Sequence, residues 1–283
     1  MSEFNPTLKC PCDKAFLKEI FIYESPPKGE TQFNIGAEKY QRAYDKCEIC
    51  EHYFSRHSIN MEHLYDSTYL DSTYGSVNGM KERLEKIQSL APEKSDNYGR
   101  VKRILKFSEN QFKGSDKKMR LLDVGSGIGV FPVEMKKEGW DVTGIEPDPR
   151  TSKFLRDELG ITTYDNKVDE LGVTKVGEFD VITFNKVLEH VEDPVEMLSA
   201  VKRFLKKTGF VYIELPDIAA SIEGKGREEF FIEHHHVFSP ESISKLINGA
   251  GFNVNSVTRI IEPSSKYTLI GFATLKESEI DNI

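Results

Sequence analysis

Short apolar runs recur along the chain from about Met119 to the C-terminus, separated from one another by turns or amphipathic stretches. Runs of this length, bounded by turn-forming residues, are typical of buried strands. They predict strands at residues 119–125, 141–146, 161–164, 179–185, 209–216, 252–261 and 266–275. The last two are neighbours in the sequence, so we expect them to pair with each other.

Apolar residues at helical spacing between these strands predict helices at residues 130–139, 149–159, 194–205 and within 239–251. Pro149 suits a first helical turn, Asp193 and Ser239 suit N-caps, and Gly160 and Gly251 suit C-terminal ends. Strands that alternate with helices form βαβ units. The expected fold class is therefore α/β, with a doubly wound, mainly parallel sheet.

The chain before Met119 follows a different pattern. Apolar positions at helical spacing predict two helices between residues 81 and 107, with a break at 92–98. Residues 53–75 are rich in Tyr, Ser and Asp without a sustained period, and we interpret them as an irregular connector. All four cysteines lie within the first 50 residues. The composition therefore divides the chain into two unequal parts.

Composition and charge narrow the classes of function. The chain is 38% hydrophobic and 30% charged, as soluble globular proteins are. Its apolar runs are far shorter than the roughly 20 residues of a membrane-spanning helix, and the N-terminus lacks the pattern of a secretory signal. A net charge of −8 disfavours nucleic acid as a partner. We expect a cytoplasmic protein without a membrane span, and the sequence leaves its oligomeric state open.

The strongest chemical signal is a glycine-rich turn between the first strand of the α/β region and the helix that follows. It reads Asp123-Val-Gly125-Ser-Gly127-Ile-Gly129, and the next strand ends at Glu146. Such a turn lets the backbone approach a nucleotide cofactor, and an acid at the next strand end can accept bonds from both ribose hydroxyls. The alternative is an ordinary tight turn with a surface glutamate. A dinucleotide site has the spacing G-x-G-x-x-G, whereas this chain has G-x-G-x-G.

The D-x-G-x-G-x-G turn resembles the first motif of class I S-adenosylmethionine-dependent methyltransferases. FDVITFNKVLEHVEDPVEML (179–198) is similar to their fourth strand and following turn, and residues 236–252 resemble the helix before their terminal hairpin. The resemblance spans about 118–275 and implies a Rossmann-like core that binds S-adenosylmethionine through Asp123, the three glycines and Glu146. It also places Asn185 and Lys186 beside the cofactor, while Glu189 and His190 shape the turn.

One position departs from that family's pattern. Many relatives carry an acid beside a small residue after the third strand, where it holds the adenine amino group. This chain reads Tyr164-Asp165-Asn166 at that point. By resemblance, Asp165 or Asn166 takes over the adenine contact, and we select Asn166.

The cysteines form two close pairs, Cys10 with Cys12 and Cys47 with Cys50, which is the number of thiolates that a structural zinc ion binds. The segment around the second pair, AYDKCEICEHYF, resembles a knuckle of the small zinc-binding domains that precede some sugar-modifying methyltransferases. Zinc is our preferred interpretation. The alternatives are reduced cysteines without metal or a site completed by His52, and a disulfide is the least favoured in the cytosol.

A candidate base follows the fifth strand, at the edge of the sheet where ligands bind in open α/β folds. The segment Phe231-Ile-Glu233-His234 resembles the Y-x-E-H segment of sugar C-methyltransferases, whose histidine acts as acid and base, although Phe231 replaces the tyrosine. We select His234, with Glu233, as the catalytic pair. The alternative is that the histidines only pack and bond within the loop. Tyr65, Tyr69 and Tyr74 are candidates to line the acceptor pocket.

These observations predict a methyltransferase whose acceptor is a small molecule, such as a hydroxyl of a nucleotide sugar or of a surface-glycan precursor in polysaccharide biosynthesis. The alternatives are an inactive zinc-containing binding protein, an NAD-dependent oxidoreductase and an RNA or protein methyltransferase. We divide the chain into a zinc-binding N-terminal region (1–75), a helical connector (76–115) and a cofactor-binding methyltransferase domain (116–283).

Overall fold

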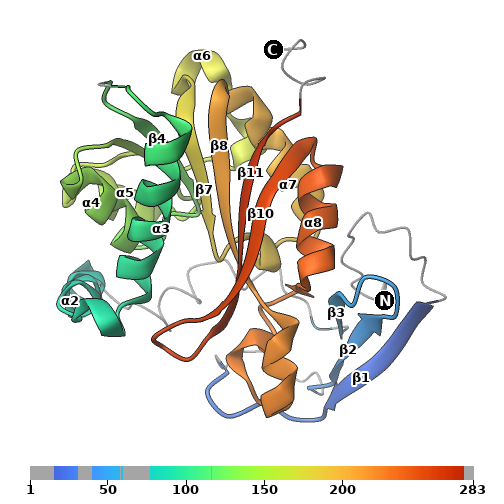
Figure 1. The fold of residues 1–283 in the computed structure, drawn as a ribbon. Coiled ribbons are helices and arrows are strands. Elements are labelled where there is room, and N and C mark those ends of the chain that lie inside the picture. Colours follow the sequence, from blue (N-terminus) through green and yellow to red (C-terminus); the bar gives the residue numbers. More distant parts are fainter. Residues whose placement is uncertain (1–15, 31–39, 58, 60–76, 116, 277–283) are drawn as a thin grey trace.

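The computed structural model describes residues 16–30, 40–57, 59, 77–115 and 117–276. Within them, a seven-stranded sheet has the order β10-β11-β8-β7-β4-β5-β6 (Figure 1). Its strands are β4 (Arg120–Val124), β5 (Asp141–Ile145), β6 (Thr162–Tyr164), β7 (Phe179–Asn185), β8 (Leu205–Pro216), β10 (Phe252–Ile261) and β11 (Tyr267–Leu275). Strands β6, β5, β4, β7 and β8 are parallel, and β11 pairs antiparallel with both β8 and β10. The predicted fold class and the predicted pair of terminal strands are confirmed.

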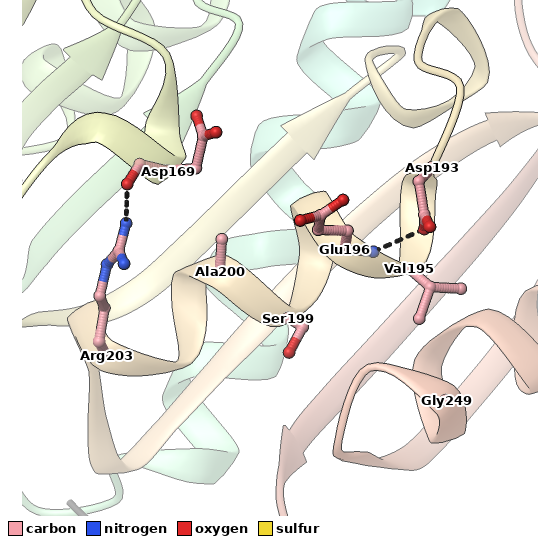
Figure 2. A pocket seen from close by; sticks show the side chains of 8 residues that line it. All are labelled: Asp169, Asp193, Val195, Glu196, Ser199, Ala200, Arg203 and Gly249. Atoms are coloured by element: carbon pink, nitrogen blue, oxygen red, sulfur yellow. Dashed lines mark hydrogen bonds between the residues drawn. The ribbon is translucent and has the colours of Figure 1, made fainter.

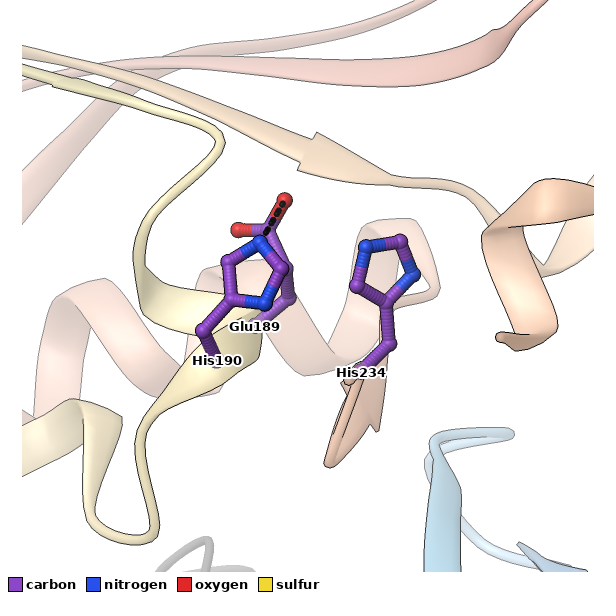
Figure 3. A group of neighbouring side chains, drawn as sticks. All are labelled: Glu189, His190 and His234. Carbon is purple, nitrogen blue, oxygen red and sulfur yellow. Dashed lines mark ion pairs between the residues drawn. The ribbon is translucent and has the colours of Figure 1, made fainter. Parts of the chain in front are cut away.

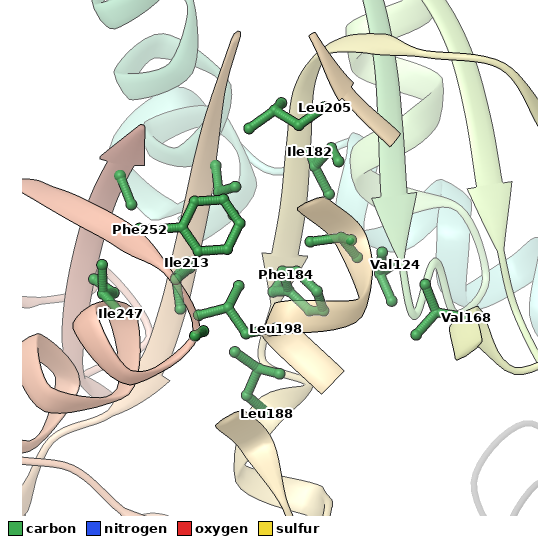
Figure 4. Packing of buried hydrophobic residues seen from close by; sticks show 14 of the residues in the cluster. Val124, Val168, Ile182, Phe184, Leu188, Leu198, Leu205, Ile213, Ile247 and Phe252 are labelled. Atoms are coloured by element: carbon green, nitrogen blue, oxygen red, sulfur yellow. The ribbon is translucent and has the colours of Figure 1, made fainter. Parts of the chain in front are cut away.

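Both faces of the sheet are buried, because successive side chains of a strand point to opposite faces. On β4, Leu121 shares a core with helices α3 (Asp96–Gln111), α4 (Val130–Lys137) and α5 (Pro149–Asp157). Leu122 shares the opposite core with α7 (Pro194–Ala200) and α8 (Pro240–Gly249). Figure 4 shows the second of these cores, where Ile182 and Phe184 of β7 meet Leu198 of α7. This two-sided burial explains why the strands read as continuous apolar runs rather than as alternating patterns.

The helices flank the sheet on both sides (Figure 1). They are α2 (Val77–Gln88), α3 (Asp96–Gln111), α4 (Val130–Lys137), α5 (Pro149–Asp157), α6 (Val173–Val176), α7 (Pro194–Ala200) and α8 (Pro240–Gly249). The predicted N-caps are confirmed, since Asp193 accepts the N–H of Glu196 and Ser239 that of Ser242. The break between the two predicted connector helices is also confirmed, by a short 3-10 turn at Pro92–Lys94. Every helix in the described part of the chain is too short or too polar to cross a membrane.

The predicted helix 194–205 is too long. The α-helix ends at Ala200, a 3-10 turn spans Val201–Phe204, and β8 begins at Leu205, four residues before the predicted start at 209. Leu205 pairs with Phe179 of β7 across an irregular register. Pairing with a neighbouring strand therefore outweighs the helical spacing of the apolar residues in this segment, which the local pattern does not reveal.

The interpretation of 53–75 as an irregular connector is wrong for its first residues. Strand β3 (Tyr53–His57) lies in a four-stranded antiparallel sheet of order β1-β2-β3-β9, with β1 (Leu17–Tyr23), β2 (Arg42–Cys47) and β9 (His236–Val237). The buried positions of β3 include Ser55 and His57, so polar residues hide the alternation that marks a half-buried strand. Residues 60–76, with Tyr65, Tyr69 and Tyr74, lie outside the described part of the chain.

Strand β9 joins this N-terminal sheet to the loop that follows β8. Tyr53 pairs with Val237 and Phe54 with His236, so residues about 180 positions apart share one ladder. A small aromatic core containing Tyr23, Tyr44 and Phe230 fills the space between sheet and loop. The N-terminal sheet therefore packs directly against the carboxyl side of the larger domain.

Candidate functional site

The glycine-rich turn lies between β4 and α4, where the strand order of the large sheet reverses direction, the usual ligand position in open α/β sheets. Gly125 has φ 73°, and a Cβ there would come within 2.6 Å of Val187 Cγ2. Gly127 has φ 51°, and a Cβ built there meets nothing within 4 Å. Gly129, the N-cap of α4, also has a left-handed backbone. The turn therefore requires glycine for its conformation and leaves space open above Gly127.

Glu146 ties the end of β5 to this turn. One carboxylate oxygen accepts the Gly127 N–H at 2.8 Å, and the other accepts the Asp148 N–H at 3.1 Å. Burial raises the pKa of Glu146, while these two backbone N–H groups oppose the rise. Each oxygen keeps a further lone pair, so the carboxylate can still accept hydroxyl groups of a ligand over the turn.

Asp123 joins β4 to β7 at the same edge. It is buried, and its Oδ1 accepts the Thr183 hydroxyl at 2.6 Å and the Asn185 amide N–H at 2.8 Å. Burial raises the pKa of Asp123 to about 6 against these hydrogen bonds. The Oδ1 atom of Asn185 is buried and has no partner among the described residues, so it remains a potential acceptor for a ligand.

Lys186 and Asn166 lie at the same carboxyl edge but differ in their surroundings. Lys186 has φ 61°, and its Nζ donates to the Thr268 hydroxyl of β11 at 2.8 Å. Burial lowers the pKa of Lys186. Asn166 follows β6 and is partly exposed. The ammonium of Lys186 is thus bound to β11. The Lys186 backbone, directly after Asn185, has the positive φ of a strained residue.

A buried ion cluster, which the sequence did not predict, lies at the same edge of the sheet, on β8. Glu214 of β8 is fully buried and accepts bonds from Arg100 and Arg103 of α3, each at 2.7 Å. Burial alone would raise the pKa of Glu214, but Arg100 and Lys186 outweigh it and lower the pKa to about 2. The available signal was a single carboxylate within the otherwise apolar strand GFVYIELP.

The residues after β8 place the predicted catalytic pair in a segment that we call the histidine loop, residues 229–236. His234 Nδ1 lies 2.9 Å from the Glu229 carbonyl, and His190 Nδ1 lies 2.9 Å from the Glu233 carbonyl. Carbonyls only accept, so both Nδ1 atoms carry hydrogen. The rings are 4.8 Å apart (Figure 3). Burial lowers the pKa of His234, which keeps it neutral and able to accept a proton.

Glu189 is the third member of this group. The family resemblance had given it only a role in shaping the turn. Its side chain is buried, and neither carboxylate oxygen has a hydrogen-bond partner among the described residues. Its Oε1 lies 4.0 Å from His190 Nε2 (Figure 3). Burial raises the pKa of Glu189, opposed by the charges of His190 and Lys186. A buried carboxylate facing two imidazoles stabilises positive charge that forms on either ring.

The same three side chains have the donor types of a metal site, but Glu189 Oε1 and His190 Nε2 lie further apart, at 4.0 Å, than two ligands of one zinc ion. Their donor atoms lie within 4.8 Å of one another, whereas ligands about 2.0–2.1 Å from a tetrahedral zinc ion lie roughly 3.3 Å apart. Glu233, the other predicted catalytic residue, has one buried oxygen without a partner in the described part of the chain, and burial raises the pKa of Glu233. Glu189, from the turn after β7, thus lies beside the imidazoles of His190 and His234, and Glu233 adjoins His234 within the histidine loop.

The second cysteine pair lies at the end of β2 and in the turn that follows it. Cys47 and Cys50 are both buried, and Cys47 Sγ accepts the N–H groups of Ile49 at 3.3 Å and Cys50 at 3.4 Å. His52 is engaged elsewhere, with one ring nitrogen 3.0 Å from the Ser242 hydroxyl and the other 2.9 Å from His236. This disfavours His52 as a ligand. Cys10 and Cys12 lie outside the described residues.

A cavity of about 530 Å³ lies elsewhere, along α7 (Figure 2). Its lining residues are Asp169, Asp193, Val195, Glu196, Ser199, Ala200, Arg203 and Gly249. None of the predicted cofactor, catalytic or metal residues lines it. We assign this acidic surface cavity no part in the site.

Comparison with known protein families identifies residues 95–257 as matching a family model described as a methyltransferase domain. A ubiquinone biosynthesis O-methyltransferase from Bordetella avium is 35% identical over 104 residues, which cover 35% of this chain and 43% of that protein. One from Klebsiella pneumoniae is 28% identical over 166 residues, covering 57% of this chain and 63% of that protein. The matches thus span about half the length of these curated relatives.

Two solved structures share the fold. Magnesium protoporphyrin IX methyltransferase from Synechocystis, solved with bound SAH, aligns with a TM-score of 0.55 at 15% identity, covering 75% of this chain and 100% of that chain. The 1,6-didemethyltoxoflavin-N1-methyltransferase from Burkholderia thailandensis aligns with a TM-score of 0.53 at 17% identity, covering 88% of this chain and 100% of that chain. At these identities the likeness concerns the architecture of the chain.

Proposed function

Because the chain belongs to the methyltransferase domain family, we propose that it is an S-adenosylmethionine-dependent methyltransferase acting on a hydroxyl of a small-molecule acceptor. The observation that carries the proposal is the bond from the Gly127 N–H to Glu146, with open space above Gly127. An amide and a carboxylate there face the same space, as a bound nucleoside requires. The unpartnered Oδ1 of Asn185 adds an acceptor at the same edge.

Each predicted cofactor residue has a proposed part in this site. Glu146 accepts the ribose hydroxyls, Asn185 accepts from the amino-acid end, and Asn166 contacts adenine. Asp123 holds Asn185 and Thr183 in place through its buried Oδ1. The remaining members shape the backbone around the ligand: Gly125, Gly127, Gly129 and Lys186. S-adenosylmethionine itself supplies the reactive methyl group on a sulfonium.

We propose His234 as the base for the acceptor. Its Nδ1 is bonded to the Glu229 carbonyl, so Nε2 can take the hydroxyl proton as the acceptor oxygen attacks the methyl group. The buried carboxylate of Glu189 stabilises the resulting imidazolium through the adjoining His190 ring. Glu233 contributes the carbonyl that orients His190. General-base assistance of this kind contributes roughly 10²–10⁴-fold to a rate.

Two acceptor classes compete. The relatives are named as O-methyltransferases of ubiquinone biosynthesis, which supports a hydroxyl acceptor. The likeness of Phe231–His234 to a sugar-methyltransferase segment supports a nucleotide sugar or glycan precursor. A panel of acceptors from both classes, assayed by formation of S-adenosylhomocysteine, separates them. Turnover of quinone precursors alone would remove the sugar proposal.

We also propose a structural zinc ion held by Cys10, Cys12, Cys47 and Cys50. The two N–H groups on Cys47 Sγ support it, because such bonds stabilise a thiolate. We expect about one zinc per chain by metal analysis, with loss of the metal in Cys47→Ser and in Cys10→Ser. We further propose that the chain divides into a zinc-binding region (1–75), a helical connector (76–115) and a methyltransferase domain (116–283).

Calorimetry tests the core of the proposal. Glu146→Ala should weaken binding of S-adenosylmethionine at least 10- to 100-fold, because bonds to a charged group contribute about 1.5–3 kcal/mol each. The matched control is Asp141→Ala, which removes an exposed carboxylate from the other end of β5. Equal affinity in all three proteins, or no binding to folded wild-type protein, would contradict the proposal.

A further inference from the structure

We propose that the N-terminal sheet positions the histidine loop for proton transfer, and that Tyr44 of β2 is the positioning residue. This proposal rests on the role of His234 put forward above. The Tyr44 hydroxyl lies 2.6 Å from the carbonyl oxygen of His234 and 3.3 Å from that of Phe231. The two carbonyls bracket the segment that carries Glu233 and His234. A tyrosine has one donor hydrogen, so the principal bond of this buried hydroxyl is the one to the His234 carbonyl, and the Phe231 carbonyl is the weaker, shared acceptor.

A buried ion pair next to Tyr44 holds the middle of the same segment. Glu30 Oε2 accepts the Ile232 N–H at 2.7 Å and the Arg42 guanidinium at 2.7 Å. The exposed fractions of the Arg42 and Glu30 side chains are only 0% and 1%. Removing two charges from water is costly, so such a pair is weak evidence for stability. Its directional bond to Ile232 instead gives the loop a defined geometry.

The strands of the N-terminal sheet hold the other end of the loop. The Ser55 N–H donates to the His235 carbonyl at 2.9 Å, and Phe54 pairs with His236. Residues 231 to 236 therefore take backbone contacts from β2, from β3 and from Glu30. The large domain also bonds to the loop. The His235 N–H donates to the Glu189 carbonyl at 2.8 Å, and the Glu233 carbonyl lies 2.9 Å from His190 Nδ1.

This arrangement matters because the His234 ring is oriented from within the loop itself. Its Nδ1 bonds to the Glu229 carbonyl, only five residues earlier. A loop that shifts as a unit keeps that bond but moves Nε2 relative to Glu189 and to the acceptor. A displacement of about 1 Å can cost roughly 10²-fold in rate. The N-terminal sheet, and Tyr44 in particular, therefore sets where the proton acceptor lies.

Tyr44→Phe removes only the hydroxyl and tests the proposal without knowledge of the acceptor. Amide hydrogen exchange of residues 231–235 should become at least tenfold faster. In protein labelled with ¹⁵N-histidine, the His234 Nε2 resonance, assigned with His234→Gln, should shift or broaden. Tyr53→Phe is the matched control, because Tyr53 is a buried tyrosine of the neighbouring strand with no hydroxyl bond to the described loop. It should leave both readouts at the wild-type values.

The outcomes are separable. Wild-type exchange and an unchanged His234 resonance in Tyr44→Phe would overturn the positioning role. If that variant fails to fold, Glu30→Gln carries the test, with faster exchange at Ile232 expected and unchanged exchange contradicting the proposal. Binding of S-adenosylmethionine should be equal in wild type and Tyr44→Phe. Absence of binding in both would remove the proposed function, while the exchange data would still decide whether Tyr44 positions the loop.

Discussion

The glycine-rich turn and the histidine loop both follow the carboxyl ends of parallel strands but are held in different ways. The bond that closes the turn joins Gly127 to Glu146, 19 residues later. The bond that holds the loop joins Tyr44 to His234, which are 190 residues apart. The turn is thus built from adjacent βαβ elements, whereas the loop depends on a separate sheet. We infer that the turn tolerates changes in the N-terminal sheet and the loop does not.

Glu214→Gln should have the largest effect, because it removes the charge that pairs two arginines in a fully buried cluster. It leaves Arg100 and Arg103 partly unpaired in a buried site, which typically costs about 3–5 kcal/mol. The folded-state pKa of Glu214, about 2, lies below the ordinary value of 4.5, so its contribution is complete above pH 4.5 and is lost as the pH falls toward 2. The difference in free energy of unfolding between variant and wild type, measured by urea unfolding, should be smaller at pH 3 than at pH 7. A constant difference would contradict the assignment of charge.

Gly125→Ala should disrupt the turn alone. The new Cβ would meet Val187 at 2.6 Å and the backbone has a positive φ, so we expect a loss of about 2–3 kcal/mol together with loss of cofactor binding. Gly114→Ala is the control, since Gly114 has φ 80° but no atom within 4 Å of its added Cβ. It should cost about 1–2 kcal/mol and leave binding intact. Hydrogen exchange of the histidine loop should be unchanged in both; faster exchange there would break the comparison.

Acid should loosen the histidine loop by a smaller amount. Burial holds the folded-state pKa of His234 well below 6.5, so the unfolded chain binds the extra proton and stability falls as the pH drops below 6.5. The expected slope from this group is about 1.4 kcal/mol per pH unit. His234→Gln should lower the slope of the unfolding free energy against pH, between pH 6.5 and 5, by the contribution of one bound proton. Urea unfolding measures this slope. An unchanged slope would mean that His234 is already protonated in the folded protein.

The sequence by itself determined the large domain and its cofactor turn. Apolar runs marked the strands, Asp193 and Ser239 marked helix starts, and the glycines marked a left-handed turn beside Glu146. These features depend on neighbours within a few residues or on adjacent elements, so the local pattern carries them. Even the longest error in this domain, the extended helix at 194–205, came from a strand pairing that no local pattern encodes.

Only the tertiary structure decided how the catalytic candidates are arranged. His234 could be selected from its segment, but its distance from His190 and the bond from Tyr44 to the loop join residues far apart in the chain. The lack of a hydrogen-bond partner for Glu189 among the described residues is likewise a property of the folded protein. The polar side chains of Ser55 and His57 are buried because β9 and the histidine loop cover them, so β3 could not be read from hydrophobicity. The physical reason is burial by a distant segment. That burial determines which faces of β3 are covered and lowers the pKa of the histidines, and it exists only once the chain has folded.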